Sequence, residues 1–475
     1  MAFVTAARRP PRRRLAAGLC LAAGAGLAAG TAAAQEADDP GGMRLNLDID
    51  SRIEVDGNSE LLVDSPGTSI IGSTRLGFGL SSETRRQSLD FGGAVTARVF
   101  DIPTRDDNTD FGDRELTFNY GREASRAALD VRARYDRTEL DRVALEDLLD
   151  EEEIDIGDPD FDDLRERGRR EIIAFGAGVE LGIDMPVRFS LDADYAERNF
   201  DETADRPDSH RFDLGAELGL RLSPVTEGTV GLTASRFERD DGAETRRDRV
   251  VLQFGVAHEF SETLSGNAAI GPALVRTRRG GTTEREVGID ADLGLDYERP
   301  TGTIGFDATA RTDEDGIRTA ASIGRDFELP RGAIGGAIGG AIGLTRAADG
   351  DIGTTGALEF RRDMPRATFN ARLVRDVTPR FDDTNVLRTV AEVEYDYAIN
   401  NISGIGLEAV FARSEETDGA DRLDRIEFGA TYSREITEDW AMEVGYRYRA
   451  RNDDAGDRES HAVFFGINRN FNFGI

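Results

Sequence analysis

The segment from Met43 to Val55 reads MRLNLDIDSRIEV, and its side chains alternate between apolar and polar. Odd positions are apolar except Ser51, whereas even positions carry a charge or an amide. Successive side chains of a β-strand point to opposite faces of the sheet. The segment therefore predicts a strand with one apolar face and one charged face.

The same alternation recurs along the rest of the chain. Between Val287 and Tyr297, apolar residues at odd positions alternate with Asp290, Asp292 and Asp296. We count about 22 such segments, with a range of 18–24, and predict an all-β fold. They begin near positions 43, 69, 88, 113, 126, 170, 187, 209, 226, 247, 263, 284, 302, 316, 332, 354, 366, 385, 403, 422, 440 and 459.

The connections between these segments alternate in length and composition. Short ones often contain Pro, as at Ser223-Pro224 and Met364-Pro365, and longer ones are acidic, as at 415–419. The longest runs over about 139–169 and is strongly acidic at its start. Tight turns at one end and long loops at the other predict an antiparallel up-and-down barrel.

The aromatic residues indicate which solvent surrounds the barrel. All nine Tyr share the parity of the apolar residues in their own segments, and most lie near a strand end, as does Trp440. Rings gathered on the apolar face at both strand ends are typical of a bilayer with two interfaces. We therefore predict a transmembrane β-barrel. A secreted β-solenoid is the main alternative, although its repeats would be more regular in length.

Composition excludes several other classes of protein. The 475 residues include 59 basic and 91 acidic side chains, and the formal net charge is −32, which disfavours nucleic acid as a partner. The single Cys, Cys20, leaves no partner for a disulfide. Beyond the N-terminus there is no apolar stretch of ~20 residues, so a helical membrane protein is excluded.

The N-terminal residues predict export from the cytoplasm. Five Arg between Arg8 and Arg14 precede an apolar run, and an Ala-rich end precedes Gln35. We predict a signal peptide at 1–34, a short periplasmic segment at 35–42 and a barrel at 43–475 with a long extracellular loop at about 139–169. The segment 35–42 is too short for a plug domain, so we expect no plugged receptor. The long loop either folds inward or extends at the cell surface.

The polar strand faces should point into the barrel. Arg beside Asp or Glu on neighbouring strands forms pairs that lower the cost of enclosing charge. A water-filled pore with a weak preference for cations and an interior of mutually paired charges are both consistent with this face. Our candidate pore-lining residues are Arg132, Arg134, Asp192, Asp194, Asp290, Asp292, Glu392, Glu394, Arg447 and Arg449.

We expect no catalytic, cofactor-binding or metal site. A barrel hydrolase needs a Ser–His or Asp–His pair near the rim, and His210 and His461 are its only candidates there, since His258 should face lipid. The segment 56–60 has carboxylates at calcium-loop spacing but lacks the turn glycine, because Leu61 stands there. Divalent cations should instead bridge the acidic loops to lipopolysaccharide non-specifically. The triple GAIG repeat at Gly332–Gly343 is either a packing strip or a tolerated repeat.

The leader, the hairpins over 43–473 and the ending resemble the outer-membrane β-barrel porins of proteobacteria, especially the type often linked to exopolysaccharide export. Final strands of that class usually end on an aromatic residue that the barrel-assembly machinery recognises. Phe471 and Phe473 have the right parity, but the chain ends at Ile475, so the signal is shifted.

The resemblance implies a location in the outer membrane of a Gram-negative bacterium. It implies outer-membrane lipid, lipopolysaccharide, the assembly machinery and possible polysaccharide-export proteins as partners, with no cofactor. The expected function is passive diffusion of ions and small hydrophilic solutes. The alternatives are a conduit for exopolysaccharide, a closed structural or adhesive barrel and, third, a hydrolase.

Overall fold

The computed structural model describes residues 42–105, 109–140, 168–201, 207–329, 335–346, 350, 352–379, 385–416 and 422–474. The predicted signal peptide at 1–34 and nearly all of the segment 35–42 lie outside these residues. The 22 strands are β1 (Met43–Asp56), β2 (Ser69–Thr84), β3 (Gln87–Asp101), β4 (Thr109–Ala124), β5 (Ala127–Glu139), β6 (Arg169–Leu181), β7 (Val187–Asp201), β8 (Ser209–Ser223), β9 (Thr226–Arg239), β10 (Thr245–Ser261), β11 (Leu264–Arg279), β12 (Thr282–Arg299), β13 (Gly302–Asp313), β14 (Gly316–Leu329), β15 (Gly335–Arg346), β16 (Ile352–Met364), β17 (Ala367–Pro379), β18 (Asn385–Asn400), β19 (Ser403–Glu416), β20 (Leu423–Glu435), β21 (Trp440–Asp453) and β22 (Gly456–Gly474).

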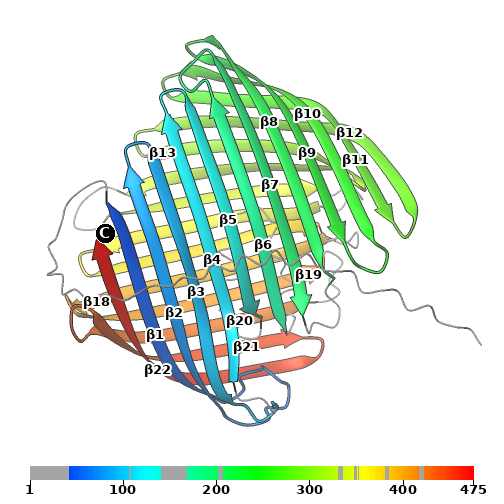
Figure 1. Cartoon of the computed structure of the whole chain (residues 1–475). Helices are drawn as coiled ribbons and strands as arrows, with labels where there is room; N and C mark the ends of the chain where they lie inside the picture. The colour runs from blue at the N-terminus through cyan, green and yellow to red at the C-terminus, as the bar shows by residue number, and fades with distance from the viewer. Residues whose placement is uncertain are drawn as a thin grey trace, which may run out of the picture. The chain divides into compact units, whose positions relative to one another are not determined.

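The strands form one antiparallel sheet that closes on itself (Figure 1). Each strand pairs with its neighbours in sequence, and β22 returns to pair with β1, with Arg44 opposite Gly474 and Asp56 opposite Ala462. Closure removes the unpaired edges that an open sheet would present. The prediction of an up-and-down barrel of about 22 strands is confirmed. No helix in the described residues is long and apolar enough to cross a membrane.

The connections differ between the two ends of the barrel. Those at the end that carries the start of β1 and the end of β22 span 2 to 5 residues, such as 85–86 between β2 and β3. Those at the opposite end span 2 to 29 residues, and the longest is 140–168 between β5 and β6. We call these the short-turn end and the long-loop end. The loop predicted at about 139–169 matches that connection, although its residues 141–167 lie outside the described residues.

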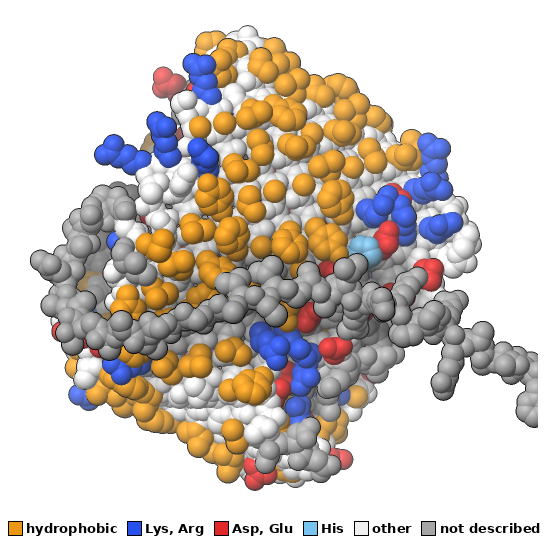
Figure 2. All heavy atoms as spheres, in the orientation of Figure 1, with side chains coloured by type: hydrophobic (Ala, Val, Ile, Leu, Met, Phe, Trp, Pro, Cys, Tyr) orange, Lys and Arg blue, Asp and Glu red, His pale blue; other side chains and the backbone are white. Residues whose placement is uncertain are grey.

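The polarity of the barrel is inverted relative to a soluble protein. In β1, Ile53 and Val55 are exposed on the outer face, whereas Glu54 and Asp56 are buried on the inner face. Figure 2 shows apolar side chains spread over the face in view, with most charged side chains near its edges. The two-residue period of the sequence therefore separates an apolar exterior from a charged interior.

The GAIG repeat contributes most of β15, although its first residues lie outside the described ones. Ile342 is exposed on the outer face, opposite Ile323 of β14 and Gly356 of β16. The inner face of this strand carries small residues such as Gly339 and Gly343, so its wall is thin there. No described contact shows a loop or a neighbouring barrel packed against it.

Candidate functional site: the charged inner wall

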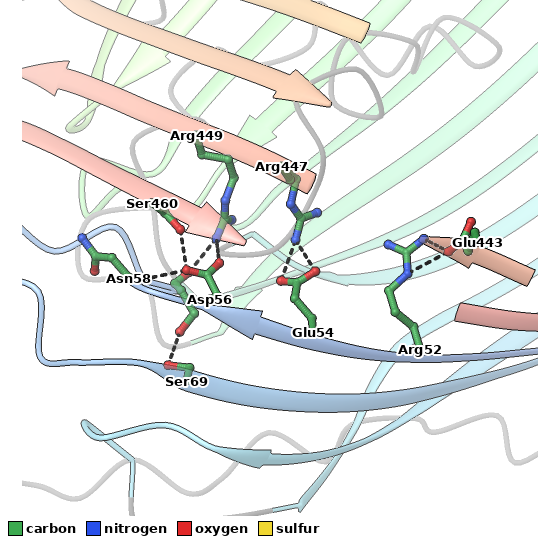
Figure 3. Close-up of polar contacts among 10 residues, drawn as sticks. Arg52, Glu54, Asp56, Asn58, Ser69, Glu443, Arg447, Arg449 and Ser460 are labelled. Carbon is green, nitrogen blue, oxygen red and sulfur yellow. Dashed lines mark hydrogen bonds and ion pairs between the residues drawn. The ribbon is translucent and has the colours of Figure 1, made fainter. Parts of the chain in front are cut away.

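Three ion pairs cross the seam where the last strand meets the first (Figure 3). Each joins an inner-face residue of β1 to one of β21, two strands away around the barrel. The distances are 2.5 Å for Arg52–Glu443, 2.8 Å for Arg447–Glu54 and 2.9 Å for Arg449–Asp56. The seam is therefore held by side chains as well as by the backbone pairing of β22 with β1.

Small residues on β22, the strand between β1 and β21, leave room for these ion pairs. Gly466 lies opposite both Glu443 and Arg52 in the two pairings of β22, and Ala462 lies opposite Arg447 on one side and Asp56 on the other. These small residues leave the space above β22 to the longer side chains of β1 and β21. Phe464 is the exception on this face, and it packs under Arg52, whose guanidinium carbon lies 4.3 Å from the ring centroid.

Asp56 is the centre of the most buried part of this network. Its side chain is completely inaccessible to solvent, and that of Arg449 is only 4% exposed. One carboxylate oxygen of Asp56 accepts hydrogen bonds from the backbone N–H of Asn58, at 2.7 Å, and from the Ser460 hydroxyl, while the other accepts from Arg449. Arg449 also donates to the carbonyl of Ser59 at 3.1 Å. The buried charges are thus paired and hydrogen-bonded, as burial requires.

The carboxylates of the segment 56–60, which has calcium-loop spacing, make structural contacts with other protein groups. Asp56 points into the seam network, whereas Glu60 accepts hydrogen bonds from the Thr104 hydroxyl at 2.6 Å and from Arg105 at 2.9 Å. The two carboxylates therefore have different partners, and the β1–β2 connection is tied to the β3–β4 connection. Among the described residues, no group of three His, Cys, Asp or Glu is placed to hold a metal ion.

The candidates on β5 and β7 repeat the arrangement at the seam. Arg132 of β5 reaches Asp194 of β7 at 3.2 Å, across β6. The intervening residue is Gly176, where an added Cβ would lie 2.5 Å from the Asp194 carboxylate. Arg134 lies 3.9 Å from Asp136 of its own strand, and Asp192 lies on the inner face two residues before Asp194. Glycine on the middle strand leaves the room that these charged pairs occupy.

Asp290 and Asp292 of β12 belong to a second polar cluster. Asp290 is buried, pairs with Arg249 of β10 and accepts the backbone N–H of Thr312 at 2.9 Å. Asp292 accepts two hydrogen bonds from Arg311 of β13, at 2.5 and 2.8 Å. Both carboxylates are thus matched by an arginine from another strand.

The tip of the β13–β14 hairpin leans into the barrel beside this cluster. Pairing of β12 with β13 stops at Ala291 and Ala310, so the strands separate above that level. Glu314 of the tip pairs with Arg247 of β10 and accepts the Thr277 hydroxyl of β11 at 2.9 Å. Because β10 lies three strands from β13, the tip must cross the inner faces of β11 and β12.

Glu392 and Glu394 lie on the inner face of β18. Asn370 of β17 donates to Glu394 at 3.0 Å, and Glu392 lies opposite Arg372. The ten candidates thus lie on the inner face of the wall and fall into four separate groups. Their role in lining a conducting path stays a prediction.

Sequence reasoning missed Glu54 and Asp56 as partners in the seam. A signal is present in the order of charges: the run Arg52, Glu54, Asp56 is opposite in sign to Glu443, Arg447, Arg449. Complementary runs on two strands separated by one strand with small residues would have indicated these pairs. Parity alone identifies the face of a side chain and not its partner.

The candidate hydrolase histidines lie on the outer face. His210 is 3.1 Å from Glu238 of β9, and His461 shares a hydrogen bond of 2.7 Å with the Tyr446 hydroxyl. Ser460 points inward to Asp56, so it lies on the opposite face from His461. Neither histidine contacts the serine beside it in the sequence.

Several solved structures are similar to this barrel. The TM-scores are 0.55 for the FrpB iron transporter from Neisseria meningitidis (10% identity, 91% of this chain and 82% of that chain), 0.51 for the ferric enterobactin receptor PfeA from Pseudomonas aeruginosa (9%, 91% and 82%) and 0.51 for the siderophore receptor PirA from Acinetobacter baumannii (7%, 90% and 80%). At this identity the likeness shows a shared fold. No protein-family model matches the sequence, and no curated protein matches it.

Proposed function

We propose that the protein is a transport barrel of a Gram-negative outer membrane, through whose lumen ions and small hydrophilic solutes diffuse. The observation that carries this proposal is the inverted polarity of the wall. An exposed apolar exterior is stable in lipid, and a closed barrel satisfies every backbone hydrogen bond of the spanning segments. Charged side chains on the inner face then require water or partners inside.

Water access on the inner face supports an open passage. Arg75 of β2 lies between Asp48 and Glu115, at 3.3 Å from each, yet its side chain is 47% exposed and that of Glu115 is 45% exposed. These inner-face charges are therefore partly solvated. Barrels of 16 or more strands are wide enough to leave an aqueous channel beyond the volume of their own side chains.

The balance of charge favours cations over anions in this passage. The chain carries 91 acidic and 59 basic side chains. Many arginines of the inner wall are held by carboxylates, which reduces the field they present to a passing anion. We expect part of the acidic surplus to lie on the inner wall, and a wall with negative excess attracts cations and repels anions.

A liposome-swelling assay tests passive diffusion. The protein, purified in folded form from membranes, is reconstituted into liposomes and diluted into isotonic solutions of sugars of increasing size. Diffusion predicts swelling rates that fall smoothly with sugar size and do not saturate with concentration. A correctly folded barrel that gives no swelling with any sugar would exclude the passive pore.

Ligand-specific transport is a second candidate, favoured by the structural neighbours, which include siderophore receptors and an iron transporter. A receptor of this kind would bind a ferric siderophore saturably and show no swelling with sugars. Titration with ferric enterobactin, followed by intrinsic fluorescence of the single Trp, separates the two functions.

Export of an exopolysaccharide is the narrower form of the transport proposal, and it would need polysaccharide-export proteins as partners. Blockage of the swelling by an added acidic polysaccharide, but not by dextran of equal size, would favour it. A closed surface scaffold predicts neither swelling nor blockage.

For assembly of the barrel, we propose that the barrel-assembly machinery recognises Phe471 and Phe473, whose rings lie stacked 6.4 Å apart near the end of β22.

A further inference from the structure

A charged region lies on the outer face of β9 to β12, just above the apolar surface at the long-loop end. The last apolar row across these strands consists of residues opposite one another in the pairing: Ala234, Val250, Leu274 and Val287. The next row contains Arg236, Asp248, Arg276 and Arg285, and the row beyond it Glu238, Arg246, Arg278 and Thr283. Each row lies about 7 Å above the one before.

Two pairs in these rows bring like charges directly together. Arg276 lies opposite Arg285, and Arg246 lies opposite Arg278. Directly opposed residues of an antiparallel pair have Cβ atoms about 4.5–5.5 Å apart, and like charges there are destabilising. Such an arrangement persists at low cost when an anion lies between the side chains.

The carboxylates of this region are already occupied. Asp248 accepts from Arg236 at 2.6 Å and from Arg246 at 3.1 Å. Within the described part of the chain, Arg276, Arg278 and Arg285 form no hydrogen bond or ion pair with another side chain, and all three are exposed. We call these three residues the arginine triplet.

The same level of the rim has the opposite arrangement elsewhere. On β19 and β20, the last apolar row pairs Phe411 with Ile426, and the next row pairs Arg413 with Asp424. Their ion pair measures 2.6 Å. In the first charged row, the outward Arg413 therefore lies opposite a carboxylate, whereas Arg276 of the triplet lies opposite another arginine. This clustering of arginines occurs in a chain whose net charge is −32.

We propose that the arginine triplet binds the phosphate groups of a phosphorylated glycolipid in the leaflet at the long-loop end. This inference rests on the proposed placement in an outer membrane. Guanidinium groups bind phosphate with two parallel hydrogen bonds, and their charge compensates that of the ligand. The exposed side chains of Val287 and Ile289 directly below form the surface for the acyl chains of the same lipid.

This site differs from the bridging of acidic loops by divalent cations that the sequence suggests. Direct contact between arginine and phosphate requires no metal ion. Binding at the triplet should therefore persist in excess EDTA, whereas binding through bridged carboxylates should be lost. It should also weaken as the ionic strength rises, because the partners are exposed charges.

Native mass spectrometry of the full barrel in detergent tests the proposal, with diphosphorylated lipid A as the probe in the presence of EDTA. We expect the double variant Arg276→Gln/Arg285→Gln to bind lipid A about tenfold more weakly, since two charge-assisted contacts are lost. The matched control Arg413→Gln, whose residue already pairs with Asp424, should bind lipid A as tightly as the parent protein.

The proposal is overturned by unchanged affinity in the double variant, by an equal loss in the control, or by lipid A without its phosphates binding as tightly as the diphosphorylated form. Inorganic phosphate is the second probe, and tight binding of it alone would assign a soluble anion instead of a lipid. Swelling assays on the same variants keep the two proposals separate. A barrel that binds lipid A through the triplet but passes no sugar would refute the pore and leave this site intact.

Discussion

Replacing Arg449 by glutamine is expected to destabilise the barrel more than any exposed arginine substitution. The change removes the charge that pairs with Asp56, whose carboxylate is fully buried, and the donor to the Ser59 carbonyl. Removal of one member of a buried ion pair leaves an uncompensated charge and costs about 3–5 kcal/mol of unfolding free energy. Urea unfolding in detergent, followed by circular dichroism and by the mobility shift of the folded barrel on gels, measures this loss.

Two further variants show whether the loss of unfolding free energy comes from the unpaired, buried charge of Asp56. In Asp56→Asn/Arg449→Gln both charges are absent, so the double variant should lose less than the sum of the two single variants. Arg75→Gln is the matched control, because Arg75 is likewise an inner-face arginine paired with carboxylates but lies about half exposed, and the change should cost about 0–1 kcal/mol. An Arg449→Gln loss no larger than that of Arg75→Gln, or full additivity in the double variant, would refute the reasoning.

Three other changes test separate parts of the structure. Gly271→Ala should destabilise the barrel by about 1–3 kcal/mol in urea unfolding, because its Cβ would lie 1.7 Å from a backbone oxygen of β10, whereas Gly231→Ala, with open space at that position, should not. Glu314→Gln should free the β13–β14 tip and raise single-channel conductance, and an unchanged current would show that the tip does not narrow the path. Partial burial raises the pKa of Asp241, but hydrogen bonds from the hydroxyl and the backbone N–H of Thr245 lower it by a larger amount, so its pKa lies below the ordinary value of an aspartate. The loop contact of Asp241 should then persist at acidic pH at which an ordinary exposed aspartate is already protonated, and limited proteolysis of the parent protein and of Asp241→Asn measures this.

The number and positions of the strands followed from two-residue periodicity. The predicted starts at 69, 187, 209 and 226 coincide with those of β2, β7, β8 and β9. Periodicity is informative here because the two faces of each strand differ in character, with apolar side chains on the outer face and charged ones on the inner face. Periodicity predicts a strand best in its middle, where every second residue lies on the apolar outer face.

The errors have physical causes. The predicted start at 113 lies four residues inside β4, because a register shift between Val95 and Ala97 changes the pairing with that strand. Beyond the shift, Phe111 is exposed although its parity differs from that of Leu116 in the same strand. The start at 459 lies inside β22, because the strand begins at Gly456 and passes through the charged residues Asp457 and Arg458 before the apolar alternation starts.

The partners of the inner-wall charges were less accessible to prediction. The contact between Arg449 and Asp56 depends on the register of three strands and on the small residue between them. The inward lean of the β13–β14 tip depends on where β12 and β13 separate. Alternation along one strand contains no information on either feature.

The central claim is that solutes pass through the barrel along its inner face. Thr233 and Leu232 are neighbours on β9, and both are exposed, Thr233 on the inner face and Leu232 on the outer. Because Cys20 is the only cysteine, Thr233→Cys and Leu232→Cys in a Cys20→Ser background each carry a single thiol. Single-channel current in a planar bilayer is recorded before and after a charged, water-soluble methanethiosulfonate is added. We predict that the reagent lowers the current of Thr233→Cys and leaves that of Leu232→Cys unchanged. Absence of current in both, or an equal response in both, would contradict the account.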